Sequence, residues 1–474
     1  MATRHTREWE RAVAEFLASP VDDEAREHGR AVVADVLAAA VAGSAAPGVA
    51  GVARAGAFAD GEATILGTDR QVAPPQAAMT NAAAAIAQEI EEGHNTGGHV
   101  GAGIVAGGLA VAEANDVDGE TFVDACTRAY EVCVRLERAI FAMKARMNDA
   151  IPWLVRNPHS TWTTVGPAVT SALCLDATAE ELAETFRIAA NLAVVSMHDP
   201  YAEGAPARNF TAGFSAQAGV TAALTALAGL EGSHAAIEAV YDPFEDLLPD
   251  GFAGQFETLG AEWAIAEHYV KPYPSCRYTH PPLDALREAV DGRSAEGGAA
   301  DPGDIESIVV RTFANATDMS NAEPETMTAG KFSAPYVLAT YLCRGSVDLD
   351  GFTDEALADE TVRSVAARVE LREDDGYEAA FPESWGASVT VELRDGTTLT
   401  GARDYPRGDY RDPMPDAEYR ERNRALLVHG LSGGSDDDRA EGKNVADARI
   451  EEALDALDAA AERPVRETVA ALRP

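Results

Sequence analysis

Lysine and cysteine are scarce in this sequence, and no long apolar run occurs. The five cysteines are odd in number and widely spaced, without a C-x-x-C pair. This argues against a disulfide framework, a zinc ribbon and an iron–sulfur dehydratase, and it fits a reducing cytoplasm. The longest apolar candidate, residues 216–230, is rich in alanine and glycine and too short to span a bilayer. Residues 1–16 carry charges throughout, so we expect no signal peptide and a soluble, cytoplasmic protein.

The charge balance is strongly acidic. There are 78 Asp and Glu residues against 38 Lys and Arg, a formal net charge of −40, and the acids are spread over the whole length. Molar salt screens such self-repulsion within about 3 Å, so we interpret the charge as an adaptation to a salt-rich cytoplasm. A surface of this sign also argues against nucleic acid or an anionic membrane as a partner.

The pattern of apolar residues changes along the chain, which suggests two domains. With 474 residues, it exceeds the size at which one hydrophobic core usually stops growing. Residues 1–265 carry apolar and alanine-rich patterns at helical spacing, which predicts a helical domain. Residues 266–403 add predicted strands at 304–313, 389–393 and 397–400, the last two joined by an Asp-Gly turn, and predicted helices at 332–342 and 353–367. Residues 404–474 become helical again, ending in a predicted helix near 445–461.

We therefore predict a mostly α protein with a smaller α/β domain. The large all-helical domain carries an inserted α+β lid, and ligands are expected to bind in the cleft between the two.

The most informative segment is Lys271–His280, with the sequence KPYPSCRYTH. It places two cations, Lys271 and Arg277, beside Cys276 and His280 within ten residues, and its two prolines favour a stiff extended loop. Fixed cations bind anions, and a titratable group beside them can move a proton near a reacting carbon. The segment predicts a site for a polycarboxylate. A solvated loop is the alternative.

Three further segments combine chemistry-bearing residues with loop-like settings. The first, residues 91–99, holds Glu91, Glu92, His94 and His99 among three glycines, so its backbone can approach a ligand closely. The histidine pair, five residues apart, does not share a helix face, which weakens a metalloprotease interpretation. An exposed acidic turn is the alternative.

The other two segments precede predicted helices rich in small residues. In residues 157–162, His159 lies beside Ser160 and Thr161, either of which can cap the helix that follows. In residues 208–213, Arg208 is placed to grip a carboxylate at a helix N-terminus. A role in capping alone is the alternative for His159.

These motifs together resemble the MmgE/PrpD family over essentially the whole chain. The family includes 2-methylcitrate dehydratases, cis-aconitate decarboxylases and iminodisuccinate epimerases. The Lys271–His280 run is the most specific part of the resemblance. The remaining parts are residues 91–99, 130–136, 159–161 and 208–213, Lys331-Phe-Ser-Ala-Pro-Tyr336 and Tyr405-Pro-Arg-Gly-Asp409.

The resemblance implies an MmgE/PrpD-like fold and a homodimer that needs no cofactor and no metal, with the active site between the domains. On this basis we expect catalytic roles for His99, His159, His280, Glu92 and Lys271, and substrate contacts from Glu91, His94, Arg208, Cys276, Arg277, Thr161 and Tyr336. The family often has Asp-Asp in the acidic loop and lysine at the Arg208 position. Because arginine keeps its proton, we expect Arg208 to bind substrate and not to act as a base.

The functional hypothesis is a lyase acting on a C4–C7 di- or tricarboxylic acid. A base, His159 or His99 with help from Glu92, removes a proton next to a carboxylate, and the cations stabilise the charge that develops. His280 or His99 then protonates the leaving hydroxyl or returns a proton to carbon. Dehydration of a 2-methylcitrate-like acid, as in propionate metabolism, is the first choice. Decarboxylation or epimerisation uses the same apparatus.

Two alternatives belong to other classes. A metal-dependent hydrolase would bind a divalent ion through Glu91, Glu92, His94, His99 and His159. A non-catalytic helical interaction protein would show no rise in melting temperature with a tricarboxylate.

Overall fold

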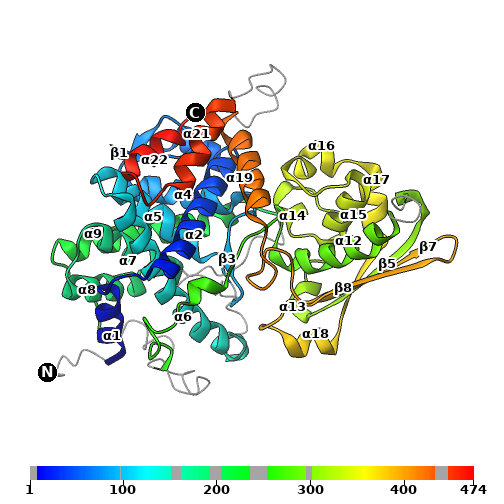
Figure 1. The fold of residues 1–474 in the computed structure, drawn as a ribbon, viewed down its shortest axis with the longest axis horizontal. Helices are drawn as coiled ribbons and strands as arrows, with labels where there is room; N and C mark the ends of the chain where they lie inside the picture. The colour runs from blue at the N-terminus through cyan, green and yellow to red at the C-terminus, as the bar shows by residue number, and fades with distance from the viewer. Residues whose placement is uncertain are drawn as a thin grey trace.

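The fold is mostly helical, with a mixed sheet in the C-terminal part of the chain, as predicted (Figure 1). The structure is a computed structural model that describes residues 8–96, 98–150, 162–192, 204–234, 254–294, 301–432 and 447–474. Two of the predicted site residues, His159 and Thr161, lie outside these ranges.

The N-terminal part of the chain forms a bundle of helices. The helical pattern predicted for residues 1–265 is present over most of the described residues of this part. Short ladders interrupt the helical pattern: β1 (Asp60–Thr64) pairs with β2 (Gln71–Val72), and β3 (Gly93–His94) pairs with β4 (His268–Tyr269). The helices are α1 (Glu8–Leu17), α2 (Asp23–Gly43), α3 (Val49–Ala55), α4 (Pro74–Ala87), α5 (Val100–Ala114), α6 (Gly119–Ala150), α7 (Trp162–Cys174), α8 (Ala179–Asn191) and α9 (Phe210–Leu227).

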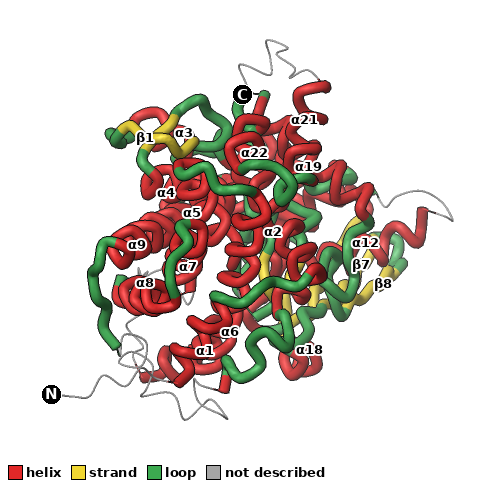
Figure 2. Tube along the Cα trace, turned by 60° about the vertical axis from the view of Figure 1, so that its left-hand side comes forward, coloured by secondary structure: helices red, strands yellow, loops and turns green. Residues whose placement is uncertain are grey.

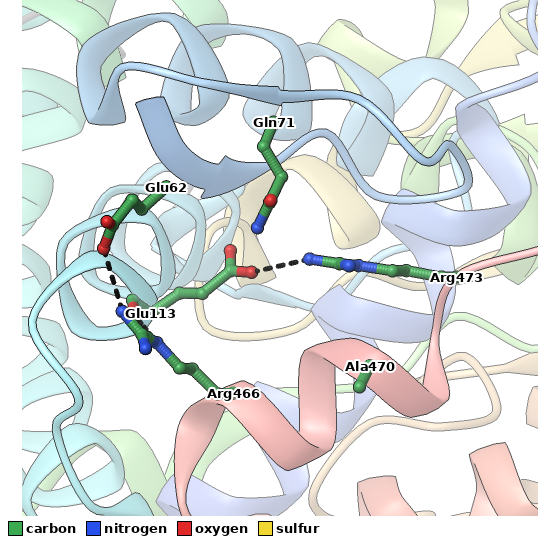
Figure 3. A pocket seen from close by; sticks show the side chains of 6 residues that line it. All are labelled: Glu62, Gln71, Glu113, Arg466, Ala470 and Arg473. Carbon is green, nitrogen blue, oxygen red and sulfur yellow. Dashed lines mark hydrogen bonds and ion pairs between the residues drawn. The ribbon is translucent and has the colours of Figure 1, made fainter. Parts of the chain in front are cut away.

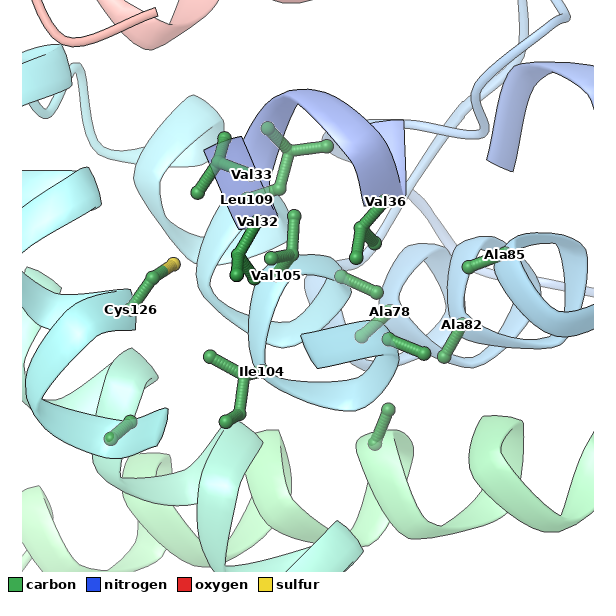
Figure 4. Packing of buried hydrophobic residues seen from close by; sticks show 14 of the residues in the cluster. Val32, Val33, Val36, Ala78, Ala82, Ala85, Ile104, Val105, Leu109 and Cys126 are labelled. Atoms are coloured by element: carbon green, nitrogen blue, oxygen red, sulfur yellow. The ribbon is translucent and has the colours of Figure 1, made fainter. Parts of the chain in front are cut away.

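Small side chains explain how these helices pack. Alanine makes up half of α4, and alanine and glycine make up most of α5; residues 77–87 of α4 and 100–113 of α5 are buried. Small residues bring helix axes close together, so α4 and α5 pack against each other and against α9. Figure 4 shows valines of α2, alanines of α4 and Ile104, Val105 and Leu109 of α5 meeting in this core.

The smaller domain is built on a four-stranded sheet with the order β6-β5-β7-β8. The predicted strands are present as β5 (Ile305–Thr312), β7 (Ala387–Leu393) and β8 (Thr398–Arg403), and β7 and β8 form the predicted hairpin. The edge strand β6 (Val369–Glu373), parallel to β5, was not predicted, because its short run is flanked by charges. The predicted helix 353–367 is divided into two. The helices are α12 (His280–Ser294), α13 (Ala314–Thr317), α14 (Met327–Lys331), α15 (Ala334–Arg344), α16 (Asp354–Leu357), α17 (Glu360–Ala366) and α18 (Asp375–Ala380).

Helix α12 lies against strands β7 and β8 and also contacts α15, so this part of the chain has its own apolar core (Figure 2). The C-terminal helices α19 (Asp416–Leu431), α21 (Asp447–Asp458) and α22 (Val465–Ala471) return to the helical bundle, where Leu427 and Leu454 join its core. Boundaries at residues 265 and 403 remain our proposal. None of the described helices has the length and apolar composition needed to cross a membrane.

Ion pairs fix the last helix to the bundle. Arg466 lies 3.0 Å from Glu62 of β1, and Arg473 lies 3.2 Å from the buried Glu113 of α5 (Figure 3). The residues of both pairs line a pocket of about 400 Å³. Since each arginine already has a carboxylate partner, we interpret these contacts as part of the docking of α22.

Candidate active site

Residues Gln88–Glu92, called the acidic loop here, connect helix α4 to strand β3. Glu89 has a φ of +51°, a left-handed conformation that few residues other than glycine adopt. The side chains of Glu91 and Glu92 are fully buried, and Glu89 is 3% exposed. Three buried carboxylates in four residues require partners, because an unpaired charge is expensive to remove from water.

A short β-ladder brings the acidic loop to the segment Lys271–His280, called the lid segment here. Gly93 pairs with Tyr269, and His94 pairs with His268. A β-carbon at Gly93 would collide with the hydroxyl of Tyr269, so the close approach requires glycine. Because Lys271 lies two residues beyond Tyr269, this register delivers its ammonium to the carboxylates of the loop.

Glu89 joins cations from two parts of the chain. Its Oε1 is paired with Nη1 of Arg208, just before α9, and its Oε2 lies 3.0 Å from Nζ of Lys271. Burial favours the protonated acid, but Arg208 and Lys271 outweigh it and lower the pKa of Glu89. Glu89 is therefore a carboxylate held between two cations.

Glu91 joins the same cluster to an imidazole. Its Oε1 lies 2.5 Å from Nδ1 of His99, the residue that precedes α5, and 3.6 Å from Nζ of Lys271. Against the effect of burial, Lys271 and His99 lower the pKa of Glu91. Its Oε2 has no hydrogen-bond partner among the described residues. The other ring nitrogen of His99, Nε2, lies 3.3 Å from Nη2 of Arg208.

The exposed side of this cluster is formed by His99 and Arg208. Their side chains are 19% and 11% exposed, whereas Lys271 and Glu91 are fully buried. A ligand that reaches the cluster from solvent therefore meets these two side chains first.

Glu92 points to different partners. It accepts hydrogen bonds from the hydroxyl of Tyr130 (2.8 Å) and from the backbone N–H of Gly101 (2.7 Å). Burial raises its pKa to about 8, against the effect of these hydrogen bonds. This arrangement ties the loop to α5 and α6.

His94 also faces away from His99. Its Nε2–H donates to the carbonyl of Ala264 (3.1 Å), and its Nδ1 lies 2.8 Å from Oγ1 of Thr96. Burial lowers its pKa to about 3, so the ring is neutral. His94 lines a separate pocket of about 640 Å³, together with Arg138, Glu267 and Arg411 among others.

The rest of the lid segment is tied to its own surroundings. Arg277 donates to the carbonyl of Arg407 (2.8 Å) and to Nδ1 of His280 (3.1 Å), and its guanidinium lies over the ring of Tyr269. Nε2 of His280 donates to the carbonyl of Ser275 (3.2 Å), so both ring nitrogens are occupied. Burial and the neighbouring Arg277 lower the pKa of His280 well below its usual value.

Cys276 and Tyr336 differ in their relation to the cluster. Burial and Glu89 raise the pKa of the Cys276 thiol to about 12, which keeps it neutral beside the acidic loop. Tyr336 donates to the carbonyl of Gly351 (2.7 Å) within the core of the smaller domain.

The structure therefore brings Glu91, His99, Arg208 and Lys271 together. Sequence reasoning missed three neighbours: Gln88, Glu89 and Lys331. Glu89 precedes the predicted segment by two residues, and its left-handed backbone has no signal in a single sequence. Lys331 begins the family-like motif at residues 331–336. The scarcity of lysine in this chain was the one feature that could have drawn attention to it.

Glu89, Glu91 and His99 are also the described residues that best match a metal site, with ligand atoms within 4.8 Å of one another. Two observations weigh against that use. Both oxygens of Glu89 already face cations, and Glu92 and His94, part of the predicted ligand set, turn elsewhere. Arg208 and Lys271, and not a metal ion, therefore neutralise the carboxylates of Glu89 and Glu91.

Comparisons with known proteins identify the family of the chain. Residues 10–253 match the MmgE/PrpD N-terminal domain, and residues 273–448 match the MmgE/PrpD C-terminal domain. A cis-aconitate decarboxylase of Aspergillus terreus is 23% identical over 387 residues, 77% of each chain. A cis-aconitate decarboxylase-like protein of Aspergillus oryzae is 24% identical over 438 residues, 87% of this chain and 88% of its own. The human cis-aconitate decarboxylase is 22% identical over 375 residues, 77% of this chain and 75% of its own. The chain therefore belongs to the MmgE/PrpD family, whose N-terminal and C-terminal domains it carries in order.

Proposed function

We propose that this chain is a cofactor-independent lyase that moves a proton next to a carboxylate of a small di- or tricarboxylic acid. The observation that carries the proposal is the shared carboxylate Glu91, which contacts His99 of the helical part and Lys271 of the lid segment. The cluster supplies both a group that transfers protons and cations that bind carboxylates.

His99 is the proposed base. We assign the Nδ1 proton of His99 to the side of Glu91, whose Oε1 lies 2.5 Å away, so the lone pair lies on Nε2. Nε2 lies 3.3 Å from Nη2 of Arg208, and substrate binding would replace that contact, which His99 can exchange because its side chain is 19% exposed. Glu91 holds the ring in one tautomer and stabilises the imidazolium that forms, as a carboxylate does in an acid–base dyad. His159 remains the predicted second imidazole.

Arg208 and Lys271 are the proposed carboxylate binders. Glu89 bridges them with one oxygen on each, the geometry in which a substrate carboxylate would bind. Substrate binding then exchanges Glu89 contacts for substrate contacts, and the cations stabilise the enediolate-like charge as the proton leaves carbon.

Dehydration of a 2-methylcitrate-like acid is the first proposed outcome. The base takes the proton from the carbon next to a carboxylate, the C–O bond to the hydroxyl breaks, an acid donates a proton to that oxygen, and water leaves as the double bond forms. In this arrangement neither ring nitrogen of His280 is available as the acid, because both are hydrogen-bonded within the lid segment.

Decarboxylation is the second proposed outcome, and the names of the relatives favour it. Here the bond between carbon and a carboxylate breaks, CO₂ leaves with its electron pair left on carbon, and a protonated imidazole supplies the new C–H proton. The same cluster supports this step, since the charge again develops next to the cations.

The test is a panel of citrate, 2-methylcitrate, cis-aconitate and iminodisuccinate in deuterated water at molar KCl, followed by NMR. Loss of water, loss of CO₂ and simple deuterium incorporation give different spectra. We expect one acid to react in the wild type and not in His99→Gln, with His28→Gln as the matched control. A folded protein that leaves all four acids unchanged and undeuterated contradicts the proposal.

We also propose that the chain forms a homodimer through one face of α9. This helix contains no charged residue, and Phe214 and Leu224 are 49% and 40% exposed. Two copies that each carry a net charge of −40 need an uncharged face to meet. Sedimentation at molar KCl should give a dimer for the wild type and a monomer for Phe214→Glu. A wild-type monomer contradicts this proposal.

A further inference from the structure

Lys331, a residue without a role in the proposed chemistry, contacts the acidic loop. It is the last residue of α14, its side chain is 1% exposed, and it is one of four lysines in the chain. Its Nζ lies 2.7 Å from the backbone carbonyl of Gln88 and 2.7 Å from the side-chain oxygen of the same residue. The ammonium also lies 5.1 Å from the centre of the Phe352 ring.

These contacts act at the point where the loop leaves α4. Gln88 caps the helix, and the next residue, Glu89, takes the left-handed conformation. A residue other than glycine holds such a conformation only when its surroundings determine it. Two hydrogen bonds from one buried ammonium fix both the peptide and the side chain of Gln88, and so they restrict the direction in which Glu89 leaves the helix.

The same residue also reaches the lid segment. The carbonyl of Lys331 accepts a hydrogen bond from the backbone N–H of Cys276 at 2.8 Å. Lys331 therefore joins the end of α4 to the segment that carries Lys271. It contacts both parts of the chain that meet at Glu89: the acidic loop through Gln88, and the lid segment through Cys276.

We propose that Lys331 is a positioning residue for the acidic loop: it holds Gln88 from the smaller domain and thereby sets where the Glu89 and Glu91 carboxylates stand. The inference rests on the proposed function only in identifying the cluster as the active site. The contact between Lys331 and Gln88 can be tested without a substrate.

The electrostatic surroundings of Lys331 provide a readout. Burial lowers its pKa to about 7, with Glu89 and Glu91 acting to raise it and Lys271 to lower it further. A neutral amine keeps two N–H donors, so both hydrogen bonds to Gln88 survive loss of the proton. The charge beside the carboxylates changes with pH, while the position of the loop is retained.

The scarcity of lysine makes this measurable directly. Labelling with [¹³C]lysine gives one set of ε-CH₂ signals for each of the four lysines, and Lys331→Met assigns one of them. We expect that signal to titrate well below the ordinary lysine range near 10.4 and to shift to lower pH still in Glu89→Gln. An ordinary titration that is unaffected by Glu89→Gln overturns the placement of Lys331 beside the loop.

Variants separate positioning from stability. Amide exchange at residues 88–92 should rise at least tenfold in Lys331→Met, less in Lys331→Arg, and not at all in the surface control Arg372→Met. Gln88→Leu, which removes only one of the two acceptors, should have an intermediate effect, and adding it to Lys331→Met should change little. Unchanged exchange in a folded Lys331→Met refutes the proposal. Once a substrate is known, kcat should fall more than KM rises and should recover in Lys331→Arg, whereas loss of stability alone would alter neither constant of the folded enzyme.

Discussion

The Glu91–His99 contact gives the sharpest prediction about catalysis. The change is Glu91→Gln, which keeps the size of the side chain and removes its charge. In the structure, Glu91 Oε1 lies 2.5 Å from the His99 ring nitrogen and 3.6 Å from Nζ of Lys271. The variant therefore removes the carboxylate that orients the imidazole and stabilises its protonated form.

The expected loss follows from the energy of such contacts. A hydrogen bond to a charged group contributes about 1.5–3 kcal/mol. At roughly 1.4 kcal/mol for each factor of ten in rate, kcat should fall by about 10- to 150-fold. KM should change much less, because Arg208 and Lys271 still bind the carboxylates. The fold should persist, since Lys271 keeps its contact with Glu89 at 3.0 Å.

The assay is steady-state turnover of the reactive acid from the NMR panel, with a melting curve for each variant. Glu62→Gln on β1 is the matched control, because Glu62 is an exposed carboxylate paired with an arginine away from the acidic loop. A folded Glu91→Gln enzyme with wild-type kcat would refute the reasoning that Glu91 acts through His99.

Three further predictions concern charge. Burial raises the pKa of Glu92 in the folded protein from its ordinary value of 4.5 to about 8. Between these two pH values the folded state holds a proton that the unfolded state has lost. The free energy of unfolding should therefore fall as pH rises from about 4.5 to 8. Glu92→Gln should reduce that slope in melting curves, and an unchanged slope would exclude the assignment. Arg208→Lys should raise KM about tenfold or more, because one ammonium cannot replace a guanidinium that contacts both Glu89 and His99. An unchanged KM would argue against a substrate-binding role for Arg208. Lowering KCl from 1 M to 0.1 M lengthens the screening distance from about 3 Å to about 10 Å, so the acidic residues repel one another more strongly and the melting temperature should fall. A melting temperature that stays constant would show that the net charge of −40 does not affect stability.

Much of the fold could be predicted because it follows from local patterns. The alanine-rich spacing of α4 and α5 predicts buried helices, and the Asp-Gly turn predicts the β7–β8 hairpin. Strand β6 could not be predicted in the same way, since it has only five residues, and its two apolar side chains, Val369 and Leu371, lie among charged ones and are only partly buried.

Four members of the candidate cluster could be predicted, but the orientation of the other predicted residues could not. The resemblance placed Glu91, His99, Arg208 and Lys271 in one site, and the structure brings these four together. It gave no means of foreseeing that His280 bonds to Arg277 and Ser275, because ring orientation depends on contacts that only the folded chain creates.

Glu89 was missed for the same physical reason. Its left-handed backbone follows Gln88, which accepts hydrogen bonds from Lys331, a residue 243 positions away in the sequence. A local pattern carries no record of such a contact.

We propose that Lys271 of the lid segment and His99 of the helical part bind the same carboxylic acid. The most direct measurement is the rise in melting temperature caused by tricarballylate, an unreactive tricarboxylate, at molar KCl. We expect a concentration-dependent rise for the wild type and for Arg372→Met, and no rise for either Lys271→Met or His99→Gln. If the melting temperature still rises in both of these variants, the acid binds elsewhere and this cluster is not the active site.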